Sequence, residues 1–184
     1  MTEFKESGLI FHFDDRWRVS QLDKERDYDK VCRAVPGTRS IDFIGYDAAS
    51  KVMLFMEVKG FRGYGNKQNL QRLTGEHDDL TAEIAQKVRD SLSVLMGGAR
   101  NSTHKSEVWQ HYANHLVNNG ELKVVAWVEL DVSTEVLLER SKVNISVRRK
   151  MLRKRLTWLT SDVQVMNTRN CHDELPGVTV GLIQ

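Results

Sequence analysis

The sequence predicts an α/β protein in which helices flank a mixed central β-sheet, and three observations support this fold class. Residues 52–56 and 122–130 are short, almost wholly apolar segments, as expected of strands buried inside a sheet. Residues 79–96 and 145–159 carry apolar side chains at helical spacing. Alternation of such strands and helices is typical of an α/β layer. With 184 residues, 40% of them hydrophobic, the chain can form a single domain, residues 1–184.

Composition argues against several classes of protein. The formal net charge is only +2, so a nucleic-acid-binding role must be argued from local clusters of basic residues. Cys32 and Cys171 lie far apart without a CxxC pair, which argues against a disulfide scaffold or zinc ribbon and favours reduced thiols. Residues 1–13 do not resemble a signal peptide, and no segment has the ~20 apolar residues needed to span a bilayer. We therefore expect a cytoplasmic protein with no membrane partner.

The first forty residues predict a short strand and a helix. Apolar residues alternate over 9–13, which favours a strand. Residues 20–34 favour a helix with Ser20 as its N-cap, and Pro36-Gly37 ends it.

Residues 40–59 predict a β-hairpin. Residues 41–46 form its first strand, residues 47–50 its turn and residues 51–59 its second strand. The second strand is apolar on both faces, so we expect it inside the sheet rather than at an edge.

Helices and further strands follow. The glycine-rich, polar residues 60–78 predict a long loop. The helix over 79–96 ends at Gly97-Gly98, and a second helix covers 105–118. After the strand at 122–130, the remaining elements are an amphipathic helix and two short strands, at residues 145–159, 163–166 and 178–183. The apolar face of that helix consists of Val147, Met151, Leu152, Leu156 and Leu159.

Charged residues converge at the end of the predicted hairpin. Side chains alternate along a strand, so Glu57 and Lys59 point to the same face. The hairpin places Asp42 beside the end of the second strand. Charges after five apolar residues need a partner or a metal. A structural Glu–Lys pair at a sheet edge is the alternative to a functional site.

This combination of residues suits metal-dependent phosphodiester chemistry. Two carboxylates, Asp42 and Glu57, suit Mg²⁺ or Mn²⁺, and the Val58 carbonyl is a further candidate ligand. The metal would polarise a phosphodiester and lower the pKa of a bound water. Lys59 would orient or deprotonate that water, or stabilise negative charge on the phosphorus.

The segments Ile41-Asp42 and Glu57-Val58-Lys59 resemble the signature of the PD-(D/E)XK nuclease superfamily, which includes restriction endonucleases, Holliday-junction resolvases and repair exonucleases. The resemblance implies a restriction-endonuclease-like core over about residues 20–131, with the basic helix and C-terminal strands, 145–184, added to it. It also implies that Asp42, Glu57 and Lys59 are catalytic. Ile41 replaces the proline that often precedes the first acid.

Other positions of the superfamily match less specifically. Many members carry an acid on the first helix, and Glu25, Asp27 and Asp29 are all candidates here. Some members place a glutamine or lysine on the helix after the motif. Gln86 lies opposite the apolar stripe of that helix, whereas Lys87 lies on its flank and could reach inward.

We therefore expect a metal-dependent endo- or exonuclease that hydrolyses DNA, in preference to RNA, by attack of a metal-activated water. The alternative is a catalytically silent, nuclease-like subunit that binds nucleic acid or assembles into a larger complex. The short chain leaves little room for a domain that reads sequence, which favours a homodimer or a partner subunit.

Two basic segments are candidates for nucleic-acid binding. Residues 148–155 hold six basic side chains: Arg148, Arg149, Lys150, Arg153, Lys154 and Arg155. They form either a phosphate-binding patch or a solvated helix face. In the loop after the hairpin, Arg62 and Lys67 are interleaved with Phe61 and Tyr64, as in loops that grip single strands. An ordinary loop is equally compatible.

Glu107, His111 and His115 share one face of a predicted helix. The glutamate that zinc proteases carry between their two histidines is missing, so we interpret these residues as a polar helix face.

Overall fold

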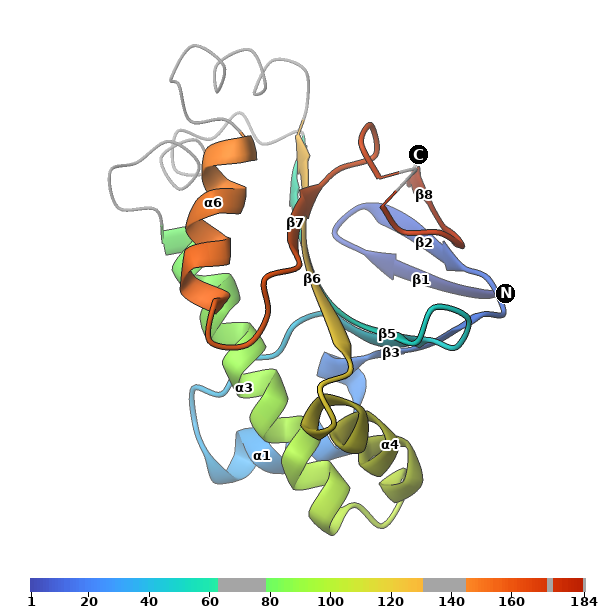
Figure 1. Ribbon diagram of the computed structural model, residues 1–184, viewed down its shortest axis with the longest axis vertical. Coiled ribbons are helices and arrows are strands. Elements are labelled where there is room, and N and C mark those ends of the chain that lie inside the picture. Colours follow the sequence, from blue (N-terminus) through green and yellow to red (C-terminus); the bar gives the residue numbers. More distant parts are fainter. Residues whose placement is uncertain (63–78, 131–144, 172–173, 184) are drawn as a thin grey trace.

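The computed structural model describes residues 1–62, 79–130, 145–171 and 174–183. A mixed five-stranded sheet runs through the molecule, with helices on one face and a small three-stranded antiparallel sheet on the other (Figure 1). The expected fold class, a mixed sheet with helices, is therefore confirmed, whereas the second sheet was not expected from the sequence.

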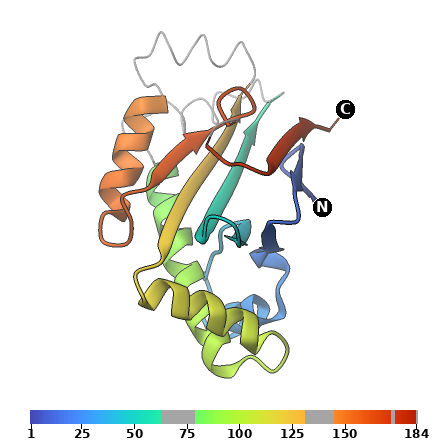
Figure 2. The ribbon, with the colours of Figure 1, turned by 45° about the vertical axis from the view of Figure 1, so that its right-hand side comes forward.

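The main sheet has the strand order β3-β4-β5-β6-β7. Its strands are β3 (Trp17–Gln21), β4 (Phe43–Asp47), β5 (Val52–Phe61), β6 (Glu121–Leu130) and β7 (Val163–Met166). The first three pair antiparallel, whereas β5, β6 and β7 pair parallel. The view in Figure 2 shows the long strands β5 and β6 side by side at the centre of the sheet.

The smaller sheet has the order β1-β2-β8, with bounds β1 (Thr2–Glu6), β2 (Leu9–Phe13) and β8 (Val178–Leu182). The turn between β1 and β2 uses the left-handed residues Ser7 and Gly8. Strands β1 and β8 both pair with β2, so the first and last strands lie in one sheet on the same side of the molecule (Figure 1).

The helices are α1 (Arg26–Ala34), α3 (Asp79–Asn101), α4 (Ser106–Val117) and α6 (Ile145–Leu156), with a 3₁₀ turn η1 at Leu22–Lys24. Helix α3 is the longest and contacts α1, α4 and α6. Among the described residues, no helix has both the length and the apolar composition that crossing a bilayer requires.

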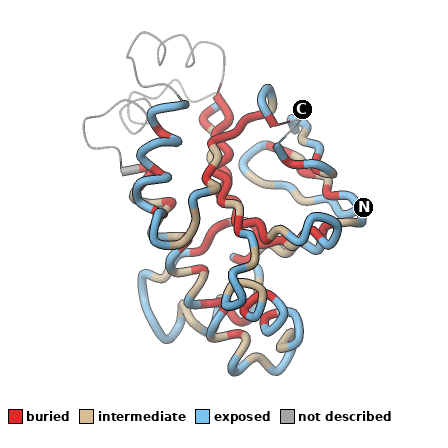
Figure 3. The backbone as a smooth tube through the Cα atoms, in the orientation of Figure 1, coloured by how far each residue is buried: buried red, intermediate tan, exposed pale blue. Residues whose placement is uncertain are grey.

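Side-chain alternation along β5 divides the core in two. Met53 and Phe55 face the helices, and Leu54 and Met56 face the small sheet. The buried segments in Figure 3 accordingly concentrate along β5 and β6. The sequence prediction that this strand is covered on both faces is confirmed.

The hairpin over 40–59, the helix over 105–118 and the strand over 122–130 are confirmed with small shifts of their ends. The helix expected over 20–34 is wrong at its start. Ser20 belongs to strand β3, and α1 begins only at Arg26, after the 3₁₀ turn. Ser20 pairs with Ile44 of β4, so pairing in the sheet takes precedence over local capping preference.

The predicted end of the long helix at Gly97-Gly98 is also wrong, because α3 continues to Asn101. A Cβ on Gly98 would lie 2.8 Å from ring atoms of Trp109. Gly98 thus lets α4 pack closely against α3, and burial of Trp109 offsets the low helix propensity of glycine.

Helix α6 presents a different face from the one predicted. Leu152 and Leu156 are buried as expected, but Val147 and Met151 are exposed. Arg148, expected on the solvated face, is only 4% exposed. The buried stripe of this helix therefore includes an arginine.

Candidate active site

The strand register brings Asp42 and Glu57 together. Phe43 pairs with Met56, and continuing the register by one residue sets Asp42 opposite Glu57. The Val58 backbone N–H donates a 2.6 Å hydrogen bond to Asp42 Oδ2, which fixes the carboxylate at the end of β5. On the other side of Asp42, the Ile41 N–H donates to Ser91 Oγ of α3.

Two lysines converge on Glu57, whose side chain is 1% exposed. Lys59 Nζ lies 2.8 Å and Lys87 Nζ lies 2.6 Å from Glu57 Oε1. Lys59 also donates a 3.0 Å hydrogen bond to Glu83. Because Glu83 and Lys87 are one helical turn apart, α3 presents a carboxylate and an ammonium group together to the end of β5. We refer to Asp42, Glu57, Lys59, Glu83 and Lys87 as the carboxylate–lysine cluster.

One oxygen of the cluster is left over. Glu57 Oε2 is buried and has no hydrogen-bond partner among the described residues. A buried carboxylate oxygen without a donor is costly in free energy. Such an atom is a candidate to bind a group that the protein itself does not supply.

Burial and neighbouring charges shift the pKa values of Asp42 and Lys59. Burial, followed by the negative charge of Glu57, raises the pKa of Asp42 to about 7. Burial alone would lower the pKa of Lys59, but the charges of Glu57 and Glu83 outweigh it and raise that pKa. Lys59 therefore remains an ammonium ion at neutral pH, which favours charge stabilisation over the base role considered from the sequence.

The turn between β1 and β2 packs against this end of β5, which the sequence did not indicate. A Cβ on Gly60 would lie 2.5 Å from the Ser7 carbonyl oxygen, so only glycine permits the contact. Glu6 precedes Ser7, and its negative charge also raises the pKa of Asp42. The N-terminal hairpin thus contributes a further acid near the cluster.

The donor set fits a hard divalent cation. Glu57 Oε2 has no donor among the described residues, and burial together with the charge of Glu57 raises the pKa of Asp42, so a bound cation would stabilise both ionised carboxylates. Carboxylate oxygens are the ligands that Mg²⁺ and Mn²⁺ prefer. Among the described residues there is no group of three or more histidine, cysteine, aspartate or glutamate side chains placed to hold a metal. The cation would therefore rest on Asp42 and Glu57; the Val58 carbonyl remains a prediction.

The acids considered on the first helix have other partners. Glu25 pairs with Lys105 at 2.6 Å. Asp27 is buried and accepts hydrogen bonds from Ser102 and Trp109. Asp29 is exposed. Glu25 and Asp27 thus hold α1 to the start of α4, a structural role.

On the helix after the motif, the two candidates separate clearly. Lys87 reaches Glu57, as the flank position suggested, whereas Gln86 is exposed. Glu83 was missed from the sequence, although its spacing of four from Lys87 placed both on one helix face.

The six basic residues of α6 do not form one patch. Arg148 is buried, and Arg155 donates a hydrogen bond to Thr81 of α3. Arg149, Lys150 and Arg153 line a cavity of about 680 Å³. Lys154 is exposed. The predicted solvated face is therefore wrong for Arg148, and phosphate binding by the other basic residues stays a prediction.

The basic residues expected in the loop after β5 are mostly outside the described part of the chain. Arg62 is exposed directly after β5. Lys67 lies outside the described residues, as does Tyr64.

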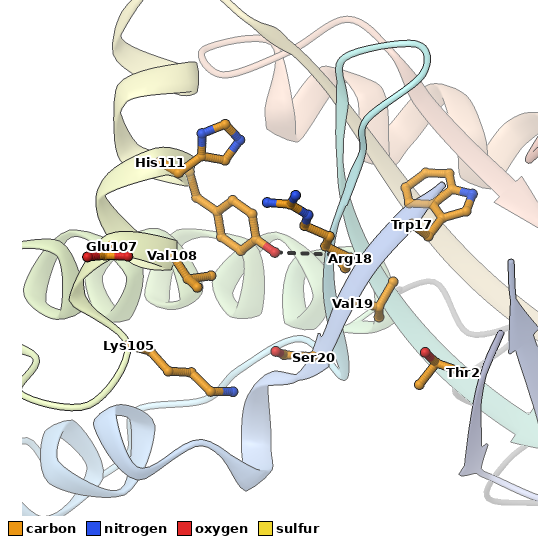
Figure 4. A pocket seen from close by; sticks show the side chains of 10 residues that line it. Thr2, Trp17, Arg18, Val19, Ser20, Lys105, Glu107, Val108 and His111 are labelled. Atoms are coloured by element: carbon orange, nitrogen blue, oxygen red, sulfur yellow. Dashed lines mark hydrogen bonds between the residues drawn. The ribbon is translucent and has the colours of Figure 1, made fainter. Parts of the chain in front are cut away.

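The acid–histidine set on α4 does not form a metal site within the described residues. Glu107 and His111 line a cavity of about 460 Å³ between α4 and β3, which Figure 4 shows with Arg18 on its opposite wall. His115 instead shares a hydrogen bond with the Glu121 carbonyl. Tyr112 also lines the cavity and donates a hydrogen bond to the Arg18 carbonyl oxygen.

Comparison of the chain with protein-family models, with curated proteins and with solved structures finds no match.

Proposed function

We propose that this protein is a metal-dependent nuclease that hydrolyses phosphodiester bonds of DNA, in preference to RNA, with Mg²⁺ or Mn²⁺. The observation that carries the proposal is the end of the β4–β5 hairpin. There Asp42 faces Glu57, one Glu57 oxygen has no partner among the described residues, and the Lys59 ammonium lies on the same face. We further propose that β4, β5, α3 and β6 correspond to a restriction-endonuclease-like core.

Asp42 and Glu57 would hold the cation. When bound, a divalent cation supplies Lewis acidity toward a phosphodiester and acidifies water. Lys59, held as an ammonium by Glu57 and Glu83, stabilises negative charge that develops on the phosphate. Its ion pairs fix the position of Nζ before substrate arrives, so little reorganisation is needed.

Lys87 has a positioning role in this mechanism. It contacts Glu57 Oε1 and leaves Oε2 unfilled. With one oxygen held by lysines, the other oxygen of Glu57 would be left to hold a cation. Glu83 acts one step further away, by orienting Lys59.

The proposal is tested with protein purified in EDTA and then supplied with Mg²⁺ or Mn²⁺. Labelled single-stranded, duplex and branched DNA, and RNA, are the substrates. We expect metal-dependent cleavage that falls at least about 100-fold in Asp42→Asn and in Glu57→Gln. The double variant should lose no more than either single variant, because both disable one unit.

Asp29→Asn is the matched control, since it removes an exposed acid of α1 and should retain activity. The proposal is wrong if wild-type protein cuts none of these polymers with either metal, or if Glu57→Gln cuts as fast as wild type.

One observation favours the second candidate, a catalytically silent subunit that binds nucleic acid or assembles with a partner. Lys59 and Lys87 together can neutralise Glu57 without a metal. Calorimetric titration with Mn²⁺ separates the two functions. A nuclease should bind the ion with an affinity lost in Asp42→Ala, whereas a silent subunit should give no binding heat in either protein.

A further inference from the structure

A groove runs between helix α6 and the edge strand β7. Its walls are Ser146, Arg149, Lys150 and Arg153 on the helix, residues 164–166 on the strand, and Asn170 and Glu174 beyond it, around a volume of about 680 Å³. We call this the α6–β7 groove. Figure 1 shows α6 beside β7, joined to it at one end by a short connection.

The groove carries a positive charge that the described protein does not neutralise. Arg149, Lys150 and Arg153 are exposed and form no ion pair with described residues. The lining has a single acid, Glu174, which lies 3.8 Å from Lys123; that lysine also lies 3.7 Å from Asp162. The lining thus holds three cations against one acid. Three cations in one groove therefore favour an anionic occupant.

The strand wall offers backbone groups as well. The Val124 N–H donates to the Asp162 carbonyl, so alternation along a parallel pair turns residues 162, 164 and 166 toward β6. Val165 lies between them in register and directs its N–H and C=O away from β6, toward the open edge. Asn167, the next residue with this orientation, donates its N–H to Asn170. Among the residues that the structure describes, no partner is found for the Val165 N–H, which places one backbone donor beside the three cations.

We propose that the α6–β7 groove binds the sugar–phosphate backbone of a single nucleic-acid strand. Basic groups at positions 149, 150 and 153 follow one another within about 6 Å along the helix axis, so they can contact adjacent phosphates of one strand. A charged groove that tracks the backbone is how proteins hold single strands without reading sequence.

The groove lies close to the carboxylate–lysine cluster, and this part of the inference rests on the proposed function. On its opposite side α6 contacts α3 through the hydrogen bond from Arg155 to Thr81. Thr81 is two residues before Glu83, which binds Lys59. The groove and the cluster therefore lie on neighbouring elements, and the inference is that one continuous strand contacts both.

Two lysines of α6 provide a matched test. Lys150 lines the groove, whereas Lys154, one turn later and equally exposed, does not. Binding of fluorescein-labelled oligo-dT is measured by anisotropy in EDTA at several salt concentrations. We expect Lys150→Gln to weaken binding about threefold and to reduce the salt slope by about 0.7, with Lys154→Gln close to wild type.

The triple variant Arg149→Gln/Lys150→Gln/Arg153→Gln should weaken binding about thirtyfold and reduce the slope by about 2. Equal effects of the Lys150 and Lys154 variants overturn the inference. So does polyglutamate of matched charge that competes as well as oligo-dT, because the groove would then bind an acidic peptide. If wild type cleaves DNA but the triple variant binds oligo-dT as tightly as wild type, the groove inference is wrong and the nuclease proposal stands. If the triple variant loses binding but wild type cleaves nothing, the nuclease proposal is wrong and the groove inference stands.

Discussion

The β4–β5 hairpin has an aspartate near each end, and the pKa values of the two are shifted in opposite directions. At the turn, Asp47 is buried and accepts two hydrogen bonds from Arg16, at 2.9 and 2.6 Å. Ser50 and the Ala49 N–H also donate to it. Burial raises the pKa of Asp47, but these donors outweigh burial and lower it.

At the open end, Asp42 accepts one backbone hydrogen bond and faces another carboxylate. Its pKa is raised to about 7. Other buried acids of this chain resemble Asp47, since Asp27 and Glu129 each accept several hydrogen bonds. Asp42 is only partly buried, and it has one backbone donor and a neighbouring carboxylate instead of a set of donors. A pKa perturbed in this way is typical of a functional site.

The largest effect should come from the lysine of the open end. Lys59→Ala should reduce cleavage at least about 100-fold, roughly 3 kcal/mol in transition-state stabilisation. Mn²⁺ affinity should persist in the same variant, because Lys59 is not a ligand. Parallel cleavage assays and Mn²⁺ calorimetry measure the two effects. Loss of Mn²⁺ affinity together with activity would contradict the assigned role.

The next largest effect is expected at Asp47, at the turn of the hairpin. Asp47→Ala should lower the free energy of unfolding by about 2–3 kcal/mol, because it removes charge-assisted hydrogen bonds and leaves Arg16 without its carboxylate. Urea denaturation followed by circular dichroism measures it. Asp29→Ala, at an exposed position, should stay within about 0.5 kcal/mol of wild type. A similar small change in Asp47→Ala would show that the ion pair contributes little.

The hairpin and its open end could be predicted because the signals are local. An apolar run, a turn and the alternation of Glu57 with Lys59 require only strand geometry. The partners from α3 were harder to predict, because a helix face shows which side chains share a side but not which strand end it reaches. Lys87 could be suggested as inward-facing and Glu83 could not.

Other parts depended on tertiary packing. Strands β1 and β3 lie at sheet edges and bury few residues, so they lack a clear apolar alternation. The Gly60 contact with Ser7 joins residues that only the folded sheets bring together. Arg148 is buried on a helix in which half of the residues are basic, and the spacing of the apolar residues does not indicate that burial.

A smaller effect of opposite sign is expected at Asp42. In metal-free protein at pH 8, Asp42→Asn should raise the free energy of unfolding by about 1–2 kcal/mol, because it removes a charge that burial and Glu57 disfavour. The amide oxygen can still accept from Val58. Adding Mn²⁺ should reverse the order by stabilising only wild type. Destabilisation in EDTA would mean that the Asp42 charge is compensated.

The smallest expected effect is the pH dependence of the free energy of unfolding, which should differ between Asp42→Asn and Asp47→Ala. Asp42 has a folded pKa of about 7, above the unfolded value near 4. Its favourable contribution is therefore complete below about pH 4 and is lost as pH rises through 7. The gain from Asp42→Asn in EDTA should accordingly shrink by about 0.5–1 kcal/mol per unit as pH falls from 7 to 5.

Asp47 behaves in the opposite sense, because its folded pKa is lowered. Its contribution is complete above the unfolded pKa near 4 and is lost only as pH falls through the lower folded pKa. The cost of Asp47→Ala should thus be constant from pH 5 to 8, while the gain from Asp42→Asn varies across that same range. Denaturant titrations of both variants and wild type at four pH values measure this. If the changes in unfolding free energy of the two variants depend on pH in the same way, the pKa values of Asp42 and Asp47 are shifted in the same direction. The electrostatic evidence that Asp42 belongs to a functional site would then be lost.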